Sequence, residues 1–159
     1  MKCHFLVAVC ALFFTAHSLK LLPQSSPNLS QEVEELAQQA QKYLQEQKPE
    51  TAIPLLREII SLDPKNLSAH ANLGVLLYFK ESYVDAIPEM RTALDSQPGL
   101  WRIRALLGIA EKRTGDPIAA QSDLEQAFPH LDDNKIQKQA GLELIELDSS
   151  LWRSSSVPQ

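Results

Sequence analysis

The amino acids of this chain recur with a fixed period of about 34 residues, and this period constrains the fold more than any other feature. Ala52, Ala86 and Ala120 are evenly spaced, and the same interval separates Gly74 from Gly108. Further pairs with this spacing are Leu73 and Leu107, Pro64 and Pro98, and Ala93 and Ala127. A fixed period of this length indicates a stack of similar units, each of which buries its apolar face against its neighbours.

The period and its residue types resemble the tetratricopeptide-repeat (TPR) family, whose unit is two antiparallel helices and a turn. The best frame places repeats at 33–66, 67–100 and 101–134. The family pattern appears in the second repeat as Leu73, Gly74, Ala86, Met90, Ala93 and Pro98, and in the third as Leu107, Gly108, Ala120, Leu124 and Ala127. The resemblance implies an all-α fold, a right-handed α-solenoid of antiparallel helix pairs.

Helix boundaries follow from the repeat frame and from residues that favour helix ends. We predict helices at 33–46, 50–62, 67–80, 84–96, 101–114 and 117–128, with a seventh near 134–148 as a partial fourth repeat or capping helix. Pro49 and Pro117 stand at the starts of second helices, where the missing N–H costs no hydrogen bond. Asp116 is a suitable N-cap, and Ser82 is its counterpart one repeat earlier.

Two residue types inside the predicted helices carry packing information. Gly74 and Gly108 are predicted to mark places where the two helices of a repeat cross closely. Pro54 and Pro88 lie one turn inside their helices, where proline removes a hydrogen bond. Since both repeats share this proline, we predict a shared bend.

The first eighteen residues have the order of a secretory signal peptide. Lys2 precedes an apolar run at 5–14, and small residues lead to a cleavage site predicted after Ser18. Ten apolar residues are about half of the roughly 20 that a membrane-spanning helix needs, which disfavours the alternative of an uncleaved N-terminal anchor. We therefore predict an exported protein, either periplasmic or secreted.

The remaining chain divides into three parts. Residues 19–31 are predicted to be a flexible linker, residues 32–148 the repeat domain, and residues 149–159 a disordered tail. Both cysteines, Cys3 and Cys10, lie in the signal segment. The mature chain is therefore expected to contain no disulfide, thiol nucleophile or cysteine metal site.

Composition and motifs argue against several classes of function. A formal net charge of −5 disfavours nucleic-acid binding, which requires a basic surface. No phosphate-binding loop, nucleophile elbow or His-Glu-x-x-His motif is present, so we predict no enzyme, no cofactor and no small-molecule substrate. His70 is expected to pack in the core. His130, Asp132 and Asp133 fit a solvated turn better than a metal site.

The resemblance also implies a binding surface, because first-helix residues at fixed positions line the concave groove of TPR domains. The candidate groove residues are Gln41, Asn72, Val75, Tyr78, Phe79, Arg102, Ile109, Lys112 and Arg113. Aromatic residues and arginine are the types that most often carry binding energy. We predict that the groove holds a protein or peptide segment with an apolar anchor and an acidic neighbour. In the alternative, the aromatics pack on the next repeat and the cations form a solvated face.

Some TPR domains hold the C-terminal carboxylate of heat-shock chaperones with a clamp of lysine, asparagine and arginine. Asn72 and Arg102 match clamp positions. However, Ala37, Gln41 and Leu106 stand where the clamp requires lysine, asparagine and a further cation. We therefore do not expect this chain to use the clamp.

The fourth repeat is incomplete, since no second helix is predicted after residue 148. This motivates an alternative function, in which the chain is a truncated or accessory TPR segment of a larger envelope protein or enzyme. A homo-oligomer is also open, because exposed ends of short solenoids can pair.

Overall fold

The computed structural model describes residues 28–132 and 134–155. Its elements are α1 (Leu29–Gln45), α2 (Pro49–Leu62), α3 (Leu67–Phe79), α4 (Tyr83–Ser96), α5 (Trp101–Thr114), α6 (Pro117–Ala127), the 3-10 turn η1 (Phe128–His130) and α7 (Asn134–Ser155). These ranges contain helices and turns and no strand. The predicted all-α fold is confirmed.

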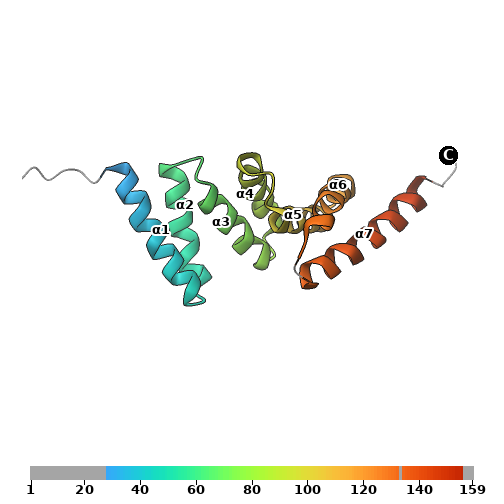
Figure 1. Cartoon of the computed structure of the whole chain (residues 1–159), viewed down its shortest axis with the longest axis horizontal. Coiled ribbons are helices and arrows are strands. Elements are labelled where there is room, and N and C mark those ends of the chain that lie inside the picture. Colours follow the sequence, from blue (N-terminus) through green and yellow to red (C-terminus); the bar gives the residue numbers. More distant parts are fainter. Residues whose placement is uncertain (1–27, 133, 156–159) are drawn as a thin grey trace, which may run out of the picture.

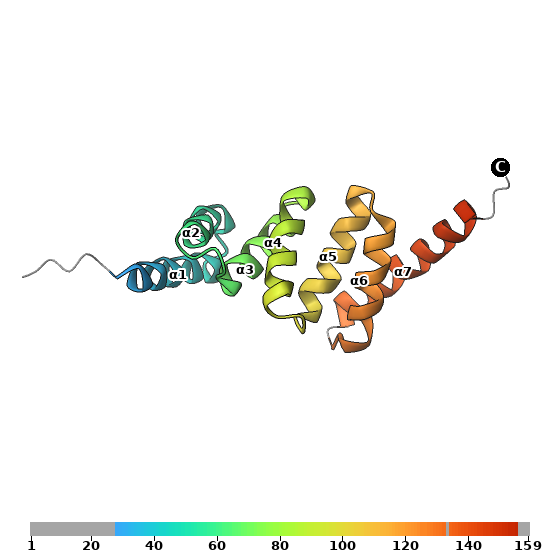
Figure 2. The ribbon, with the colours of Figure 1, turned by 90° about the horizontal axis from the view of Figure 1, so that it is seen from above.

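The helices form a solenoid in which α1 pairs with α2, α3 with α4 and α5 with α6, and successive pairs stack in chain order (Figure 1). Each pair corresponds to one unit of the sequence period. Seen from above, α5 and α6 lie side by side, and α7 runs outward beyond them (Figure 2). The repeat period therefore predicted both the pairing and the order of the helices.

Close crossings occur where the glycines predicted them. A Cβ atom at Gly74 would lie 2.8 Å from Cγ of Met90, and one at Gly108 would lie 2.8 Å from Cγ of Leu124. Both distances are shorter than any normal carbon contact, so a side chain at either position would force the two helices of the repeat apart. The three evenly spaced alanines are fully buried: Ala52, Ala86 and Ala120.

The turn inside each repeat needs one residue with left-handed backbone geometry. Gln47, Glu81 and Gly115 occupy the same position in successive repeats, and their φ angles are 57°, 60° and 91°. Glycine adopts this region without strain, whereas a residue with a Cβ atom pays a conformational cost of about 1 kcal/mol. The third repeat therefore has the residue that the turn favours, and the first two do not.

Helix starts follow the predictions with one exception. The Asp116 carboxylate accepts a hydrogen bond from the backbone N–H of Ala119 at 3.1 Å, as an N-cap should. Pro49 and Pro117 are the first residues of their helices. Ser82 occupies the predicted N-cap position of α4, but its side chain makes no capping hydrogen bond.

The helices continue through the internal prolines, since Pro54 lies inside α2 and Pro88 inside α4. The ring can be accommodated because both prolines are exposed and point away from the buried face. The bend that these prolines predict stays a prediction.

Both ends of the repeat domain extend further than predicted. Helix α1 begins at Leu29, inside the segment predicted to be a linker, and α7 continues to Ser155, inside the predicted tail. No proline or glycine interrupts either extension, and serine alone does not end a helix. The predicted signal peptide at 1–18 lies outside the described residues. Within residues 28–132 and 134–155, no helix is both long and apolar enough to span a membrane.

Candidate protein-binding groove

Helices α3, α5 and α7 surround an apolar hollow of about 570 Å³. Its lining comprises Val75, Phe79, Gly99, Leu100, Trp101, Arg102, Ile103, Leu106, His130, Asp132 and Ile136. A second hollow of about 390 Å³ adjoins it and shares Phe79, Arg102, Leu106 and Ile136. We call the two together the central groove. It has the size and the apolar lining typical of a site for an anchoring side chain.

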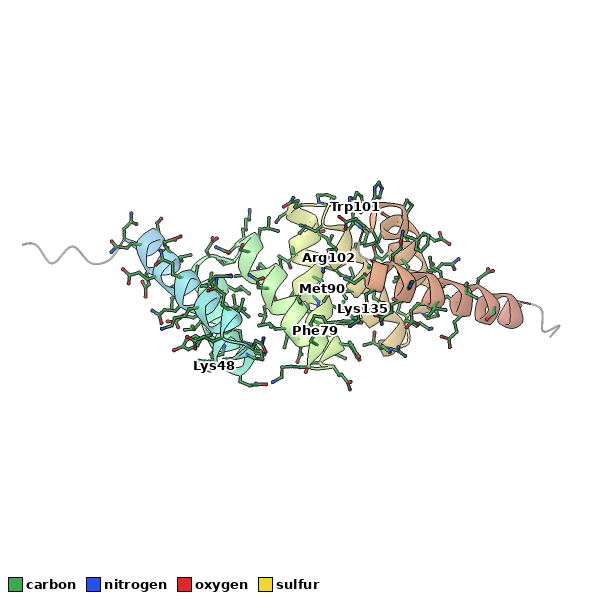
Figure 3. The ribbon with its side chains drawn as sticks, turned by 60° about the horizontal axis from the view of Figure 1, so that its bottom comes forward. Lys48, Phe79, Met90, Trp101, Arg102 and Lys135 are labelled. Carbon is green, nitrogen blue, oxygen red and sulfur yellow. The ribbon has the colours of Figure 1, made fainter. Side chains whose placement is uncertain are left out.

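The exposed aromatic residue of the central groove is Phe79, at the end of α3. Its side chain is 71% exposed, and its ring contacts Tyr78 edge-on at a centroid distance of 5.4 Å. Phe79, Arg102 and Lys135 project from three different helices toward the same face (Figure 3). A phenylalanine held by its neighbour, yet open to water on most of its surface, can bury that surface against a partner.

Tyr78 has a structural role in the folded chain. It is only 8% exposed, its ring packs against Tyr83 at 5.5 Å, and it lines the second hollow together with Gln139 of α7. Burial raises the pKa of Tyr78 above its ordinary value of 10. Tyr78 is therefore largely packed between its aromatic neighbours, and Phe79 exposes far more of its surface to a ligand.

One wall of the central groove was missed by sequence reasoning. The Trp101 ring at the start of α5 stacks on the His130 ring, with centroids 4.0 Å apart and planes at 16°. The only sequence signal was a tryptophan at the first position of a repeat, outside the positions that the family pattern assigns to the groove. His130 is exposed, as predicted for a turn residue, and it also completes this wall.

The predicted cations at the end of α5 are used inside the chain. Lys112 pairs with Glu143 and, at 2.6 Å, with Glu146, and Arg113 pairs with Glu143 at 3.1 Å. Burial alone would lower the pKa of Lys112, but hydrogen bonds and negative charge from the two glutamates outweigh it and raise that pKa. Lys112 and Arg113 therefore hold α7 against α5, and their predicted contact with a ligand stays a prediction.

Ile109 is also not available to a ligand, because it is only 1% exposed. It lies in the middle of α5, on which α7 packs. Ile109 is therefore buried inside the folded chain instead of exposed in the groove, and its predicted binding role stays a prediction.

The remaining predicted residues divide between two places. Val75 and Arg102 line the central groove with Phe79. Gln41 and Asn72 line a separate hollow of about 440 Å³ between α1 and α3. The structure brings Val75, Phe79 and Arg102 together. Their binding role stays a prediction.

The histidines among the described residues are His70, predicted in the core, and His130, predicted in a turn. His70 is 7% exposed, and its ring nitrogens contact a Glu89 carboxylate oxygen at 2.6 Å and the Pro64 carbonyl at 3.1 Å, as expected for a packed histidine. Among the described residues, no three metal-ligating side chains come together in a way that could hold a metal ion. Asp133 lies outside those residues.

A buried ionic cluster lies apart from the central groove, between α4, α5 and α6. Glu111 is 1% exposed, accepts a hydrogen bond from Arg91 at 2.7 Å, and has a second carboxyl oxygen that is buried without a hydrogen-bond partner. Burial, assisted by the negative charge of Asp123 and opposed by Arg91, raises the pKa of Glu111 to about 7. Asp123 is partly buried and pairs with Arg104 at 2.7 Å.

Comparisons with known proteins agree with this architecture. Residues 43–105 match the family profile of the tetratricopeptide repeat. No curated protein sequence matches the chain significantly.

Solved structures of TPR domains superimpose on most of the chain. The first TPR of Spaghetti (RPAP3), bound to an HSP90 peptide, matches with a TM-score of 0.63 and 20% identity, over 77% of this chain and 94% of that one. The second TPR domain of human RPAP3, in complex with an HSP70 peptide, matches with a TM-score of 0.62 and 21% identity, over 76% and 98%. The Yersinia enterocolitica type III secretion chaperone SycD, in complex with a peptide of the translocator YopD, matches with a TM-score of 0.62 and 17% identity, over 74% and 93%.

At these identities the superpositions establish the fold and leave function open. The sequence period, the stacked helix pairs and the matched profile lead to one conclusion. Residues 43–105 carry tetratricopeptide repeats, and the chain folds as a TPR solenoid.

Proposed function

We propose that this chain is a non-enzymatic interaction module that holds a protein or peptide segment in its central groove. The observation that carries the proposal is Phe79, which is 71% exposed at the edge of an apolar hollow of about 570 Å³. Binding is favoured when a partner side chain excludes water from both the exposed ring and the hollow, because burial of apolar surface lowers the free energy of the complex.

The similar solved structures support a binding role of this kind. Both RPAP3 domains and SycD are in complex with peptides. The chemistry of the partner must be argued from this chain, because its clamp positions differ. Ala37, Gln41 and Leu106 supply none of the charge that a chaperone C-terminus requires.

The partner segment that fits best has an apolar anchor and an adjacent acidic residue. Val75, Leu106 and Ile136 give the hollow its apolar walls, and Arg102 and Lys135 lie at its edge. A carboxylate next to the anchor would meet these cations and would steer the encounter.

We propose further that the protein acts after export, with residues 1–18 removed. The support is the sequence order of cation, apolar run and small residues. N-terminal sequencing of the protein from its native host tests this, since cleavage after Ser18 leaves Leu19 as the first residue. A chain that begins at Met1 would instead support the uncleaved anchor.

Two other roles rest on the end of the stack. A second copy of this chain is a further partner, through a surface distinct from the groove. Alternatively, the chain is an accessory TPR segment of a larger envelope protein or enzyme.

A comparison of captured partners tests the groove directly. The purified protein, a Phe79→Ala variant and an Ile118→Ala variant are used in parallel to capture proteins from the native envelope or secreted fraction. Ile118 is 73% exposed on α6 and lines neither hollow of the central groove, so it is a matched control for loss of exposed apolar surface. A partner held by the first and third proteins and lost by Phe79→Ala supports the proposal, whereas equal capture by all three refutes the groove.

A further inference from the structure

The outer face of α7 is exposed at positions that are buried in the other repeats. One period beyond Leu73, Gly74 and Leu77 stand Leu107, Gly108 and Glu111, and one period further stand Gly141, Leu142 and Ile145. The first two sets are buried, at 5% exposure or less wherever a side chain is present. Leu142 and Ile145, by contrast, are 69% and 71% exposed.

The exposure has a clear structural cause. In the second and third repeats these positions are covered by the second helix of the same repeat, as the contacts of Gly74 with Met90 and of Gly108 with Leu124 show. Within the described residues α7 has no such helix, and Phe128 alone reaches Gly141. The result is an apolar hollow of about 600 Å³ that includes Phe128, Gly141, Leu142 and Ile145. We call this surface the α7 face.

We propose that the α7 face is covered by the α7 face of a second copy of this chain, with the two helices antiparallel. Leu142 and Ile145 lie one helical turn apart on one side of the helix, so a two-fold axis midway between them places each Leu142 opposite the other copy's Ile145.

Charge along α7 favours this antiparallel arrangement. In this register, Lys138 of one copy lies within one residue, about 1.5 Å along the axis, of the level of Asp148 in the other copy. Both side chains are exposed. Two opposite-charge pairs then flank the apolar centre, whereas a parallel pairing would place each charge beside its own kind.

The expected dimer is weak. The α7 face contributes only a few residues from each copy, compared with the roughly 20–30 residues per side of a standard stable interface. We therefore expect a dissociation constant on the order of 10–100 µM. The central groove, which contains Phe79, shares no lining residue with the hollow of the α7 face and therefore remains free in this dimer. Helix α7 lies at the end of the stack (Figure 2).

Analytical ultracentrifugation of the full chain, from about 1 µM to about 500 µM, tests the proposal. The expected result is a concentration-dependent shift from monomer to dimer, abolished by Leu142→Glu and unchanged by Ile118→Glu, a control at a similarly exposed residue. Circular dichroism verifies that both variants keep their helix content. A chain that stays monomeric throughout, or a dimer that survives Leu142→Glu, overturns the proposal.

A charge exchange tests the register. Lys138→Glu and Asp148→Lys should each weaken the dimer about tenfold, since each single change turns two attractive pairs into repulsive ones. The two changes together should restore the original dissociation constant to within about threefold, because the pairs are then attractive again in reversed order. A double variant at least as weak as either single variant contradicts the antiparallel arrangement.

Discussion

Glu111 places a titratable carboxyl in the core of the third repeat, and its replacement by glutamine should make the protein more stable above neutral pH. The carboxyl is 1% exposed and has one oxygen without a hydrogen-bond partner. Burial disfavours its charged form, and the nearby Asp123 adds like-charge repulsion. Glutamine has nearly the same shape, carries no charge, and can still accept the hydrogen bond from Arg91.

The size of the effect follows from the raised pKa. Folding moves the pKa of Glu111 from its ordinary 4.5 to about 7, so between these values the folded chain holds more protons than the unfolded chain. Stability therefore decreases as pH rises through this window. At about 1.36 kcal/mol for each pKa unit, the full cost is about 3 kcal/mol, of which about 2.5 kcal/mol develops between pH 5 and pH 8.

Urea unfolding at pH 5 and pH 8 measures this cost. The free-energy difference between Glu111→Gln and the unaltered protein should change by about 2–3 kcal/mol in favour of the variant as pH rises. Glu50→Gln, at an exposed glutamate paired with Lys80, is the matched control and should show little change. If the two proteins keep a constant difference across this range, Glu111 is not held neutral by burial and the reasoning is wrong.

Four further changes have defined outcomes. Glu81→Gly should raise the free energy of unfolding by about 0.5–1 kcal/mol in urea titrations, because it relieves the left-handed backbone strain; a loss of stability would contradict the strain argument. Gly108→Ala should lower the free energy of unfolding by about 1–3 kcal/mol in the same assay. An unchanged value would mean that α5 and α6 can move apart at little cost. Lys112→Ala leaves the buried Glu143 without its lysine, so amide hydrogen exchange in α7 should accelerate at least about tenfold. Unchanged protection would mean that this ion pair does not hold α7 in place. Phe79→Ala should weaken binding of a captured partner by about 2 kcal/mol in calorimetric titration without lowering the melting temperature, whereas a lower melting temperature would reveal a packing role.

The repeat architecture could be predicted from sequence because each of its determinants acts within one unit or between adjacent units. Gly74 and Gly108 report the crossing of two helices that follow one another in the chain. Ala52, Ala86 and Ala120 are buried at the same position of three successive repeats, so each indicates the same close packing of a second helix. Because the same helix pair is repeated along the chain, a single sequence contains several independent indications of that pair.

The candidate site could be predicted only in part, because the position of α7 depends on contacts between distant residues. The repeat frame treats every first helix alike, and it therefore assigned Ile109, Lys112 and Arg113 to an open groove. Ion pairs to Glu143, which lies beyond the end of the third repeat, join Lys112 and Arg113 to α7 instead. A pattern that describes single repeats contains no information about such pairs.

Helix ends were the other weak point. Serine-rich composition suggested a tail after residue 149, yet α7 continues to Ser155. Residues such as leucine and arginine in this segment favour helix, and the first proline after Gly141 is Pro158. Composition indicates average behaviour over a segment, whereas helix termination requires a specific residue at a specific place.

The central claim is that a partner segment binds in the groove of Val75, Phe79, Leu106 and Ile136. The most direct measurement is a titration of the isotopically labelled protein with a captured partner, in which backbone amide shifts are followed by NMR. We expect the largest shifts to cluster at these residues, with Arg102 and Lys135 at the edge, and we expect Phe79→Ala to abolish them. Shifts confined to the α7 face, or to the outer surface around Ile118, would contradict the claim.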